Sequence, residues 1–171
     1  PDSRQLEDGA PNAFQFEIHN AAYPARMASE TADVLGDAIW ARDVAWPIVL
    51  ESARFYAANL RLDGKAWSLQ VKPSMGQDEF GGKNAKNYLC ALFSAEYTLS
   101  TALAFSRRWK LPLPERAAWA GILRAGLAYE RLFKPNLGVY ATSKKPGYQL
   151  GRQKHPVQIN PLWILPMGHV D

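Results

Sequence analysis

The stretch "NAKNYLCALFSAEYTLSTALAFSRRW", residues 84–109, decides the fold of this chain. Its apolar side chains recur at helical spacing and form one continuous stripe. The stripe and the two aromatic residues that widen it are Tyr88, Leu92, Ala95, Leu99 and Leu103, with Phe93 and Tyr97. A helix this apolar is expected to be buried on more than one side. We therefore predict that it is the central helix of an all-α core.

Helical patterns flank this stretch on both sides. Residues 13–36 are mostly helical in composition, although Pro24 is expected to break or kink the helix. Residues 37–64 have apolar side chains at the spacing of a buried amphipathic helix. Pro47 is tolerated in the first turn of this helix, and Asp63-Gly64 is expected to end it. A further helix, "LPERAAWAGILRAGLAYERLF" (113–133), follows a proline-rich turn.

Long irregular segments separate these helices. "WSLQV" (67–71) alternates like a short strand, and the residues up to 83 have the composition of a loop. Residues 134–156 show little periodicity, and long loops inside compact domains are often functional. The pattern predicts an all-α architecture of helical hairpins with long loops at one rim, as in an α/α toroid or solenoid.

Composition sets limits on the class of protein. A chain of 171 residues with 47% apolar and 21% charged residues is suited to one folded domain, residues 1–171. The single cysteine, Cys90, excludes an internal disulfide framework. No run of 18 apolar residues occurs, so we expect no membrane span. The spacing of His, Cys and carboxylate residues indicates no metal site, and we expect no cofactor.

The net charge of +4 is unevenly distributed. Residues 1–97 hold 9 Lys/Arg against 13 Asp/Glu, and residues 98–171 hold 11 against 3. The basic residues are scattered over predicted helices, without a groove-reading motif or an aromatic-interleaved basic stretch, so we expect no nucleic-acid partner. Oppositely charged halves that dock on each other, or on missing neighbours, explain the split equally well.

The loop "SMGQDEFGGKNAKN" (74–87) carries the candidate chemistry. A carboxylic acid can protonate a departing glycosidic oxygen if its surroundings raise its pKa. Glu79 has Phe80 beside it, Met75 near it, and glycines that would let a substrate approach the backbone. Asp78 cannot be the matching base, because neighbouring side chains point in different directions. The alternative is a turn whose acidic residues complement a helix N-terminus.

Three stretches, in order, resemble a known enzyme family. "GQDEF", followed by "NAKN" and the apolar helix, resembles the general-acid segment of glycoside hydrolase family 65 and its six-hairpin relatives. "FEIHNAA" (16–22), followed by "WPIVLESARFYAANL" (46–60), resembles the Glu-Ile-His segment and the next helix of that family. "RQKHPVQINPLWILP" (152–166) resembles its Lys-Gln-Ala-Asp-Val stretch, which binds substrate.

The resemblance implies a six-hairpin (α/α)6 barrel that cleaves α-linked glucosides or related sugars with inversion. Glu79 would be the general acid and Asp78 its motif neighbour. The residues expected to bind substrate are Gln153, Lys154 and His155, with His19, Trp67 as a sugar platform, and Asn87. His19 could instead be a structural histidine, residues 153–155 a solvated basic turn, and Trp67 part of the core.

The chain departs from the family pattern at Gln77, at Gly81 and at the pair His155-Pro156, which favours a divergent six-hairpin glycosidase. A toroid of twelve helices exceeds its length, which leaves room for about five or six. We therefore expect the middle of such a barrel. The catalytic base would lie downstream of Asp171, in the remaining segments of the barrel or in another chain. A secreted or periplasmic location is slightly favoured.

Three alternatives stay open beside an inverting hydrolase. A sugar phosphorylase would use the same fold. A polysaccharide lyase would abstract a proton with a tyrosine or histidine and neutralise a uronate with a basic residue. Its candidate residues are Tyr140, Tyr148, His155 and Lys154. The third alternative is a non-catalytic helical interaction module whose acidic loop is structural.

Overall fold

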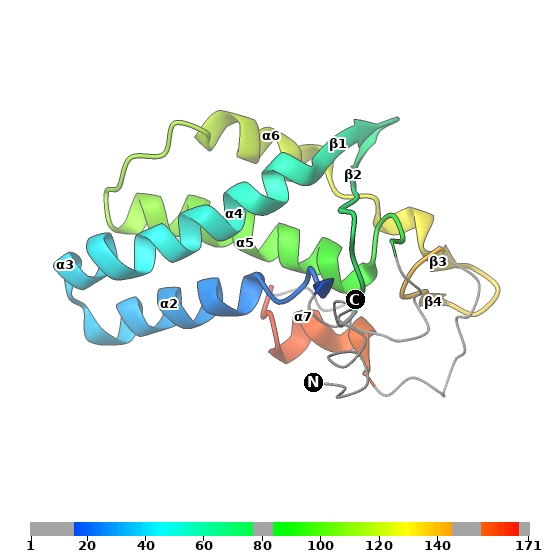
Figure 1. Cartoon of the computed structure of the whole chain (residues 1–171), viewed down its shortest axis with the longest axis horizontal. Coiled ribbons are helices and arrows are strands. Elements are labelled where there is room, and N and C mark those ends of the chain that lie inside the picture. Colours follow the sequence, from blue (N-terminus) through cyan, green and yellow to red (C-terminus); the bar gives the residue numbers. More distant parts are fainter. Residues whose placement is uncertain (1–15, 77–83, 145–154, 168–171) are drawn as a thin grey trace, which may run out of the picture.

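A computed structural model describes residues 16–76, 84–144 and 155–167 of the chain (Figure 1). Its elements in chain order are α2 (Ala22–Leu35), α3 (Ala38–Trp40), the π-helical turn η2 (Ala41–Ala45), α4 (Trp46–Asn59), β1 (Leu60–Asp63), β2 (Ala66–Leu69), α5 (Leu89–Arg108), α6 (Arg116–Ala125), η4 (Tyr129–Arg131), β3 (Phe133–Lys134), β4 (Val139–Tyr140), η5 (Val157–Ile159) and α7 (Asn160–Trp163). This part of the chain is mostly helical, as the sequence predicts.

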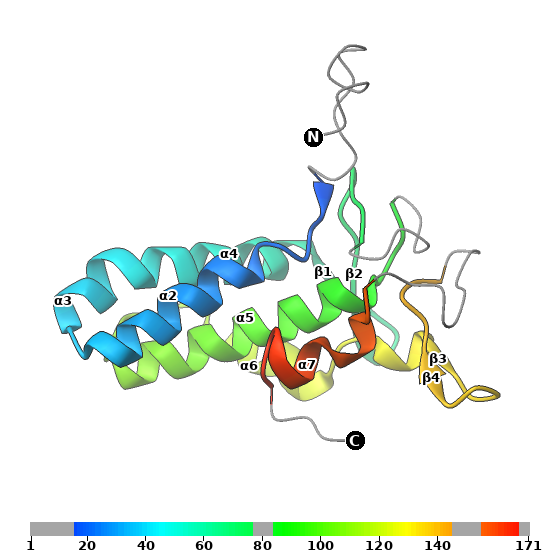
Figure 2. The same ribbon diagram turned by 90° about the horizontal axis from the view of Figure 1, so that it is seen from below.

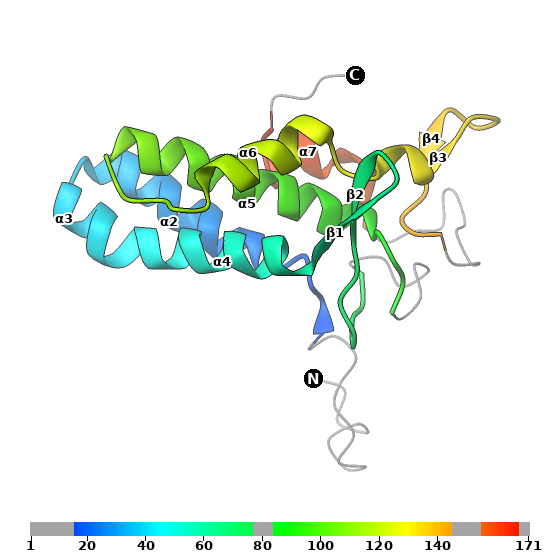
Figure 3. The same cartoon turned by 90° about the horizontal axis from the view of Figure 1, so that it is seen from above.

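The core is a bundle centred on α5. Helices α2, α4 and α5 each pack against the other two, and α6 packs on α5 (Figures 2 and 3). The predicted stripe is buried: Leu92 and Leu99 have no exposed surface, and Tyr97 on its flank is 8% exposed. By length and composition α5 could cross a membrane, but 72% of its most apolar window is buried inside the protein. Such burial is typical of a core helix.

Two prolines lie within helical segments without ending them. Pro24 occupies the first turn of α2, where a backbone N–H has no partner within the helix, so the predicted break does not occur. Pro47 lies inside a helical run that begins at α3 and continues through η2 into α4. Pro47 cannot donate to the ladder. Just before it the helix widens, and Trp46 N donates to the carbonyl of Ala41, five residues back.

Helix α4 ends four residues earlier than its pattern predicts. Residues 60–63 form β1 instead, which pairs antiparallel with β2 and places Asp63 opposite Ala66. Gly64, with φ of 72°, makes the turn between the two strands. The pair Asp63-Gly64 therefore closes a β-hairpin rather than a helix.

The α2–α4 connection and the irregular α5–α6 connection, residues 109–115, lie at one end of the bundle, and the α4–α5 connection lies at the other (Figure 1). The start of α2, the end of α4, the start of α5 and the end of α6 lie at this other end, beside the β1–β2 and β3–β4 hairpins (Figures 1 and 3). At the opposite end Arg108 Nε pairs with Asp33 Oδ1 at 3.1 Å, which joins α5 to α2.

Candidate functional site

The structure describes four of the predicted site residues: His19, Trp67, Asn87 and His155. The general acid Glu79, its neighbour Asp78, and the pair Gln153 and Lys154 lie outside the described residues. These four residues belong to the segments 77–83 and 145–154. The residues on either side of each segment are described.

Two hydrogen bonds between Ser74 and Asn84 join the chain before and after the segment 77–83, and we call this pair of residues the neck. Asn84 N donates to Ser74 O at 2.8 Å, and Ser74 N donates to Asn84 Oδ1 at 2.8 Å. Asn84 has φ of 55°, a left-handed conformation that asparagine tolerates better than most residues. The two reciprocal bonds hold the chain before and after the segment side by side.

The side chain of Tyr88 packs against the backbone on both sides of this neck. Its hydroxyl accepts a hydrogen bond from Ala85 N at 2.9 Å and donates to Ser74 O at 3.4 Å. A Cβ on Gly76 would lie 2.5 Å from Cδ1 of the Tyr88 ring. The glycines of this loop are expected to let a substrate approach the backbone, but at Gly76 the close neighbour is the Tyr88 ring.

Asn87 joins the start of α5 to strand β2. Its backbone N donates to Leu69 O at 2.8 Å, and its side-chain Oδ1 accepts from Leu69 N at 2.7 Å. Its Nδ2 donates to Ser68 Oγ at 3.2 Å, and the side chain is almost fully buried. The described contacts of Asn87 are therefore structural, and its contact with a substrate stays a prediction.

The chain before α2 lies against the same neck. Met75 N donates to Phe16 O at 2.9 Å, and Ile18 N donates to Met75 O at 3.4 Å. This short parallel bridge places the "FEIHNAA" stretch directly beside Met75, two residues before the segment 77–83. Two motifs that are almost 60 residues apart in the sequence are thereby in contact.

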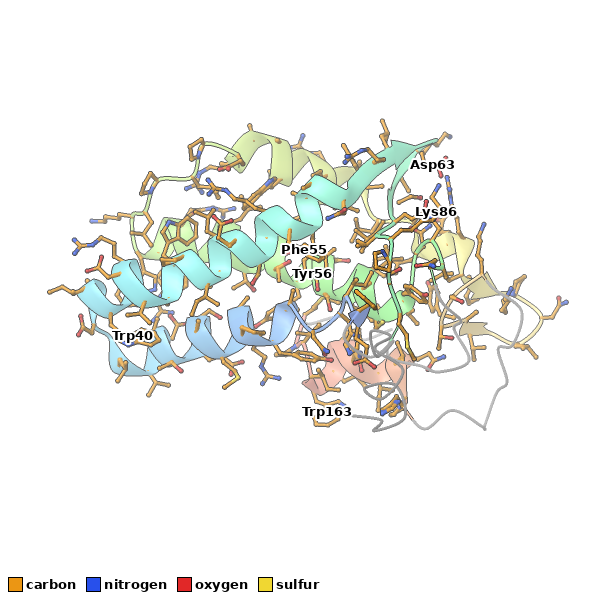
Figure 4. The ribbon with its side chains drawn as sticks, viewed as in Figure 1. Trp40, Phe55, Tyr56, Asp63, Lys86 and Trp163 are labelled. Carbon is orange, nitrogen blue, oxygen red and sulfur yellow. The ribbon has the colours of Figure 1, made fainter. Side chains whose placement is uncertain are left out.

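His19 is held between two helices. Its carbonyl accepts hydrogen bonds from Tyr56 Oη of α4 at 3.2 Å and from Ser94 Oγ of α5 at 3.0 Å. Figure 4 shows Tyr56 on the side of α4 that faces the bundle. The His19 side chain is 4% exposed, and its ring and that of Tyr23 form a T-shaped contact with centroids 5.7 Å apart.

The imidazole of His19 has an unusual polar environment. Its Nε2 lies 3.8 Å from Glu17 Oε2, and its buried Nδ1 has no hydrogen-bond partner among the residues that the structure describes. Burial, reinforced by the nearby His155, lowers the pKa of His19 to about 4. The ring is therefore neutral near pH 7 and can donate or accept a hydrogen bond. An unpartnered buried nitrogen costs about 1–3 kcal/mol, so it requires an explanation.

The C-terminal motif reaches the same end of α5. His155 is exposed and is the second cause, after burial, of the lowered pKa of His19. Two residues later Val157 is buried in the main core, and η5 packs against α5. Before the segment 145–154, Thr142 O accepts a hydrogen bond from Leu89 N, the first residue of α5, at 2.9 Å.

Trp67 takes a different position, in the β1–β2 hairpin. Its backbone N donates to Gly126 O at 2.9 Å, and its carbonyl accepts from Ala128 N at 2.9 Å. The side chain is half-buried and packs against the main core. These contacts agree with the core alternative, and the sugar platform stays a prediction.

Several residues of the site were not identified by sequence reasoning. Ser74 Oγ and Thr142 Oγ1 are, like His19 Nδ1, buried without a hydrogen-bond partner within the described structure. Tyr56 and Tyr88 supply hydroxyls to the backbone of the converging segments. Their positions in apolar stripes indicated core residues only, because helical spacing does not reveal what a tyrosine hydroxyl contacts.

The chain matches no protein-family model and no curated protein. Within residues 16–76, 84–144 and 155–167, no group of three His, Cys, Asp or Glu side chains is arranged to hold a metal ion. The interpretation of the site therefore rests on its own residues.

Proposed function

We propose that this protein is an inverting glycoside hydrolase in which Glu79 is the general acid. One observation carries the proposal: three stretches that resemble one family, far apart in the sequence, meet at the start of α5. His19 accepts a hydrogen bond from Ser94 Oγ of α5, which joins the first two, and η5 of the third packs against α5.

The chemistry assigned to these residues is proton donation to a leaving-group oxygen. An inverting enzyme needs a base about 6.5–9.5 Å from its acid, which leaves room for the attacking water. Asp78 is too close in sequence to serve, so the base belongs to another segment. We assign substrate contacts to His19, whose neutral ring suits a sugar hydroxyl, and to residues 153–155.

We further propose that the helical hairpins are part of an (α/α)6 toroid. Helices α2 and α4 run antiparallel, as do α5 and α6, which gives two consecutive hairpins (Figure 1). The segments before α2, between α4 and α5, and after α6 lie at one end of the bundle, as expected for a toroid with its site at one rim. The remaining hairpins, and with them the base, would come from the rest of the same barrel or from another chain.

The test is turnover of α- and β-linked gluco-, galacto- and fuco-disaccharides by the wild-type protein and by Glu79→Gln. Removing a general acid is expected to lower kcat by roughly 10²-fold or more. Glu51→Gln is the matched control, because Glu51 is exposed on α4 and pairs only with Arg54 at the surface among its described contacts. Each assay is run with and without phosphate.

The outcomes separate the alternatives. Turnover that requires phosphate would indicate a phosphorylase with the same acid. Products that absorb in the ultraviolet would indicate a lyase, which forms unsaturated sugars. Sugar binding without turnover, unchanged in Glu79→Gln, would indicate a non-catalytic module, and equal activity in both proteins would refute the assignment of Glu79.

A further inference from the structure

The end of the molecule that carries the two β-hairpins is strongly basic. It consists of the β1–β2 hairpin (60–69), the turn before α5 (84–88) and the stretch from the end of α6 through the β3–β4 hairpin (126–144), and we call it the hairpin end. These segments hold six Lys/Arg against two Asp/Glu, and the rest of the sequence holds 14 against 14. The basic residues of the hairpin end are Arg61, Lys65, Lys86, Arg131, Lys134 and Lys144.

Contacts around Asp63 bring these separate segments together. The guanidinium of Arg131 binds the Asp63 carboxylate through Nη1 and the Asp63 carbonyl through Nη2, and the ammonium group of Lys86 pairs with the same carboxylate. Figure 4 shows Lys86 and Asp63 at this end of the molecule. Two cations thus surround one carboxylate, so this group keeps a net positive charge. Arg131 first and then Lys86 hold the pKa of Asp63 well below its usual range, which keeps it ionised.

Three lysines of the hairpin end extend the positive surface. Lys65, Lys134 and Lys144 are exposed, and in the part of the chain that the structure describes no carboxylate forms an ion pair with them. Lys65 lies beside the Asp63 group, because a Cβ built on its neighbour Gly64 would be 3.6 Å from Arg131 Nη2. An anionic group that approaches this surface therefore meets ammonium groups that no described carboxylate neutralises.

Two aromatic rings lie exposed among these charges. Phe133 and Tyr140 are paired across β3 and β4, with ring centroids 5.2 Å apart and planes inclined at 55°. The two residues are 41% and 37% exposed. Gln158 Nε2 donates to Tyr140 O at 2.9 Å, which attaches the hairpin to η5. The hairpin therefore presents ring faces to solvent, and such faces can bind the apolar face of a sugar ring.

We infer that the hairpin end binds a polysaccharide that carries carboxylate or sulfate groups. Ammonium and guanidinium groups form charge-assisted hydrogen bonds with such anions, and the two rings supply contacts for the sugar itself. A neutral sugar would leave the cations unused, and a small anion would leave the rings unused. The choice of a polysaccharide rests on the proposed function, which acts on sugars. The inference extends that function to an anionic polymer.

The experiment measures binding without turnover. Dissociation constants are determined for polygalacturonate and for its methyl ester, which has the same backbone without the charges, and likewise for dextran sulfate and neutral dextran. We expect at least one charged polymer to bind about 10-fold or more tightly than its neutral counterpart. A single-stranded DNA oligonucleotide and vesicles that contain phosphatidylserine are measured beside them. The vesicles are included because Leu137, exposed in the turn of the β3–β4 hairpin, would suit a lipid surface.

The first double variant removes charge from the hairpin. Lys134→Gln with Lys144→Gln is expected to weaken binding of the charged polymer about 10-fold, because two charged donors are lost. Arg107→Gln with Lys110→Gln is the matched control. It removes the same charge from exposed residues at the opposite end of the bundle, so binding should stay near that of the wild type.

The second double variant removes the rings. Phe133→Leu with Tyr140→Leu keeps apolar side chains on β3 and β4, so the hairpin is expected to stay folded, but no ring face is left. Binding of the charged polymer should weaken about 5-fold. This variant separates recognition of a sugar from simple ion exchange, because ion exchange depends on the lysines alone.

Every result decides the inference. A preference for a charged polymer that both hairpin variants weaken, and that the control keeps, supports it. Neutral and charged polymers that bind equally would overturn it, and so would a control that weakens binding as much as the loss of Lys134 and Lys144. Loss of the rings without effect would reduce the binding to ion exchange and overturn the inference. Tighter binding of the oligonucleotide or the vesicles would also overturn it, in favour of a nucleic acid or a lipid surface.

Failure of the proposed function gives a different result. Binding of a charged polymer by a protein that turns over no sugar supports the binding surface and refutes the glycosidase proposal. Turnover of neutral disaccharides by a protein that binds neither charged polymer refutes this inference alone.

Discussion

At the scale of single residues, Gly76 is required by the close approach of an aromatic ring. A Cβ there would lie 2.5 Å from Cδ1 of Tyr88 and 3.0 Å from two further ring atoms, and the ring is buried. Gly76→Ala is therefore expected to lower the free energy of unfolding by about 1–3 kcal/mol, because ring or backbone must move. Urea denaturation measures this change.

Gly121 provides the control for that substitution. It lies inside α6, and a Cβ built on it meets nothing within 4 Å. Gly121→Ala should raise the free energy of unfolding by roughly 0.5–1 kcal/mol, because alanine loses less backbone entropy on folding. Equal effects at the two glycines would contradict the packing described for Tyr88.

A second prediction at this scale concerns the pH dependence of stability at His19. Its pKa is lowered from 6.5 to about 4 in the folded protein, so between these values only the unfolded chain takes up the proton. The contribution of His19 is therefore fully present above about pH 6.5 and is lost as pH falls towards 4. The full loss is roughly 3 kcal/mol.

The measurement compares urea denaturation of the wild type and His19→Gln between pH 7.5 and pH 4. Other groups titrate in both proteins, so the quantity of interest is the difference between their free energies of unfolding. We expect that difference to shift against the wild type as pH falls. Parallel curves would show that His19 titrates normally in the folded protein.

At the scale of elements, Arg26 attaches α7 to α2. Its Nη1 donates to the carbonyls of Trp163 and Ile164, each at 2.6 Å, and Nε pairs with Glu30. Arg26→Met is expected to release α7, because two carbonyls lose a charged donor. Hydrogen exchange at the amide of Leu165 should accelerate at least several-fold. Arg124→Met, on the exposed part of α6, should leave it unchanged.

The sequence predicts the burial of α5 correctly but misplaces the ends of two helices. The apolar stripe of α5 is confirmed, because burial on several sides requires an unbroken apolar pattern. The same reasoning extended α4 to Asp63, since Leu60 continues the helical spacing although it enters a strand. It also began α5 too early, because nothing in "NAKN" shows that two asparagines adopt left-handed backbone conformations.

At the scale of the whole molecule, the uneven distribution of charge along the sequence is partly explained by ion pairs between its acidic and basic parts. Asp33 and Asp63, in the acidic part, pair with Arg108 and Arg131, in the basic part. The sequence identified the stretches of the candidate site one at a time. It could not show that they meet at the start of α5, because the contacts of His19 and the bridge at Met75 depend on how distant segments pack.

In the proposed function Glu79 protonates the leaving group. Glu79→Gln is therefore compared with the wild type on two substrates of the same sugar, a disaccharide and the corresponding glycosyl fluoride. Fluoride leaves without needing a proton from the enzyme, so only cleavage of the disaccharide depends on a general acid. We predict that the variant loses roughly 10²-fold or more on the disaccharide and stays near wild type on the fluoride. Equal losses on both substrates, or no loss on either, would show that Glu79 is not the general acid.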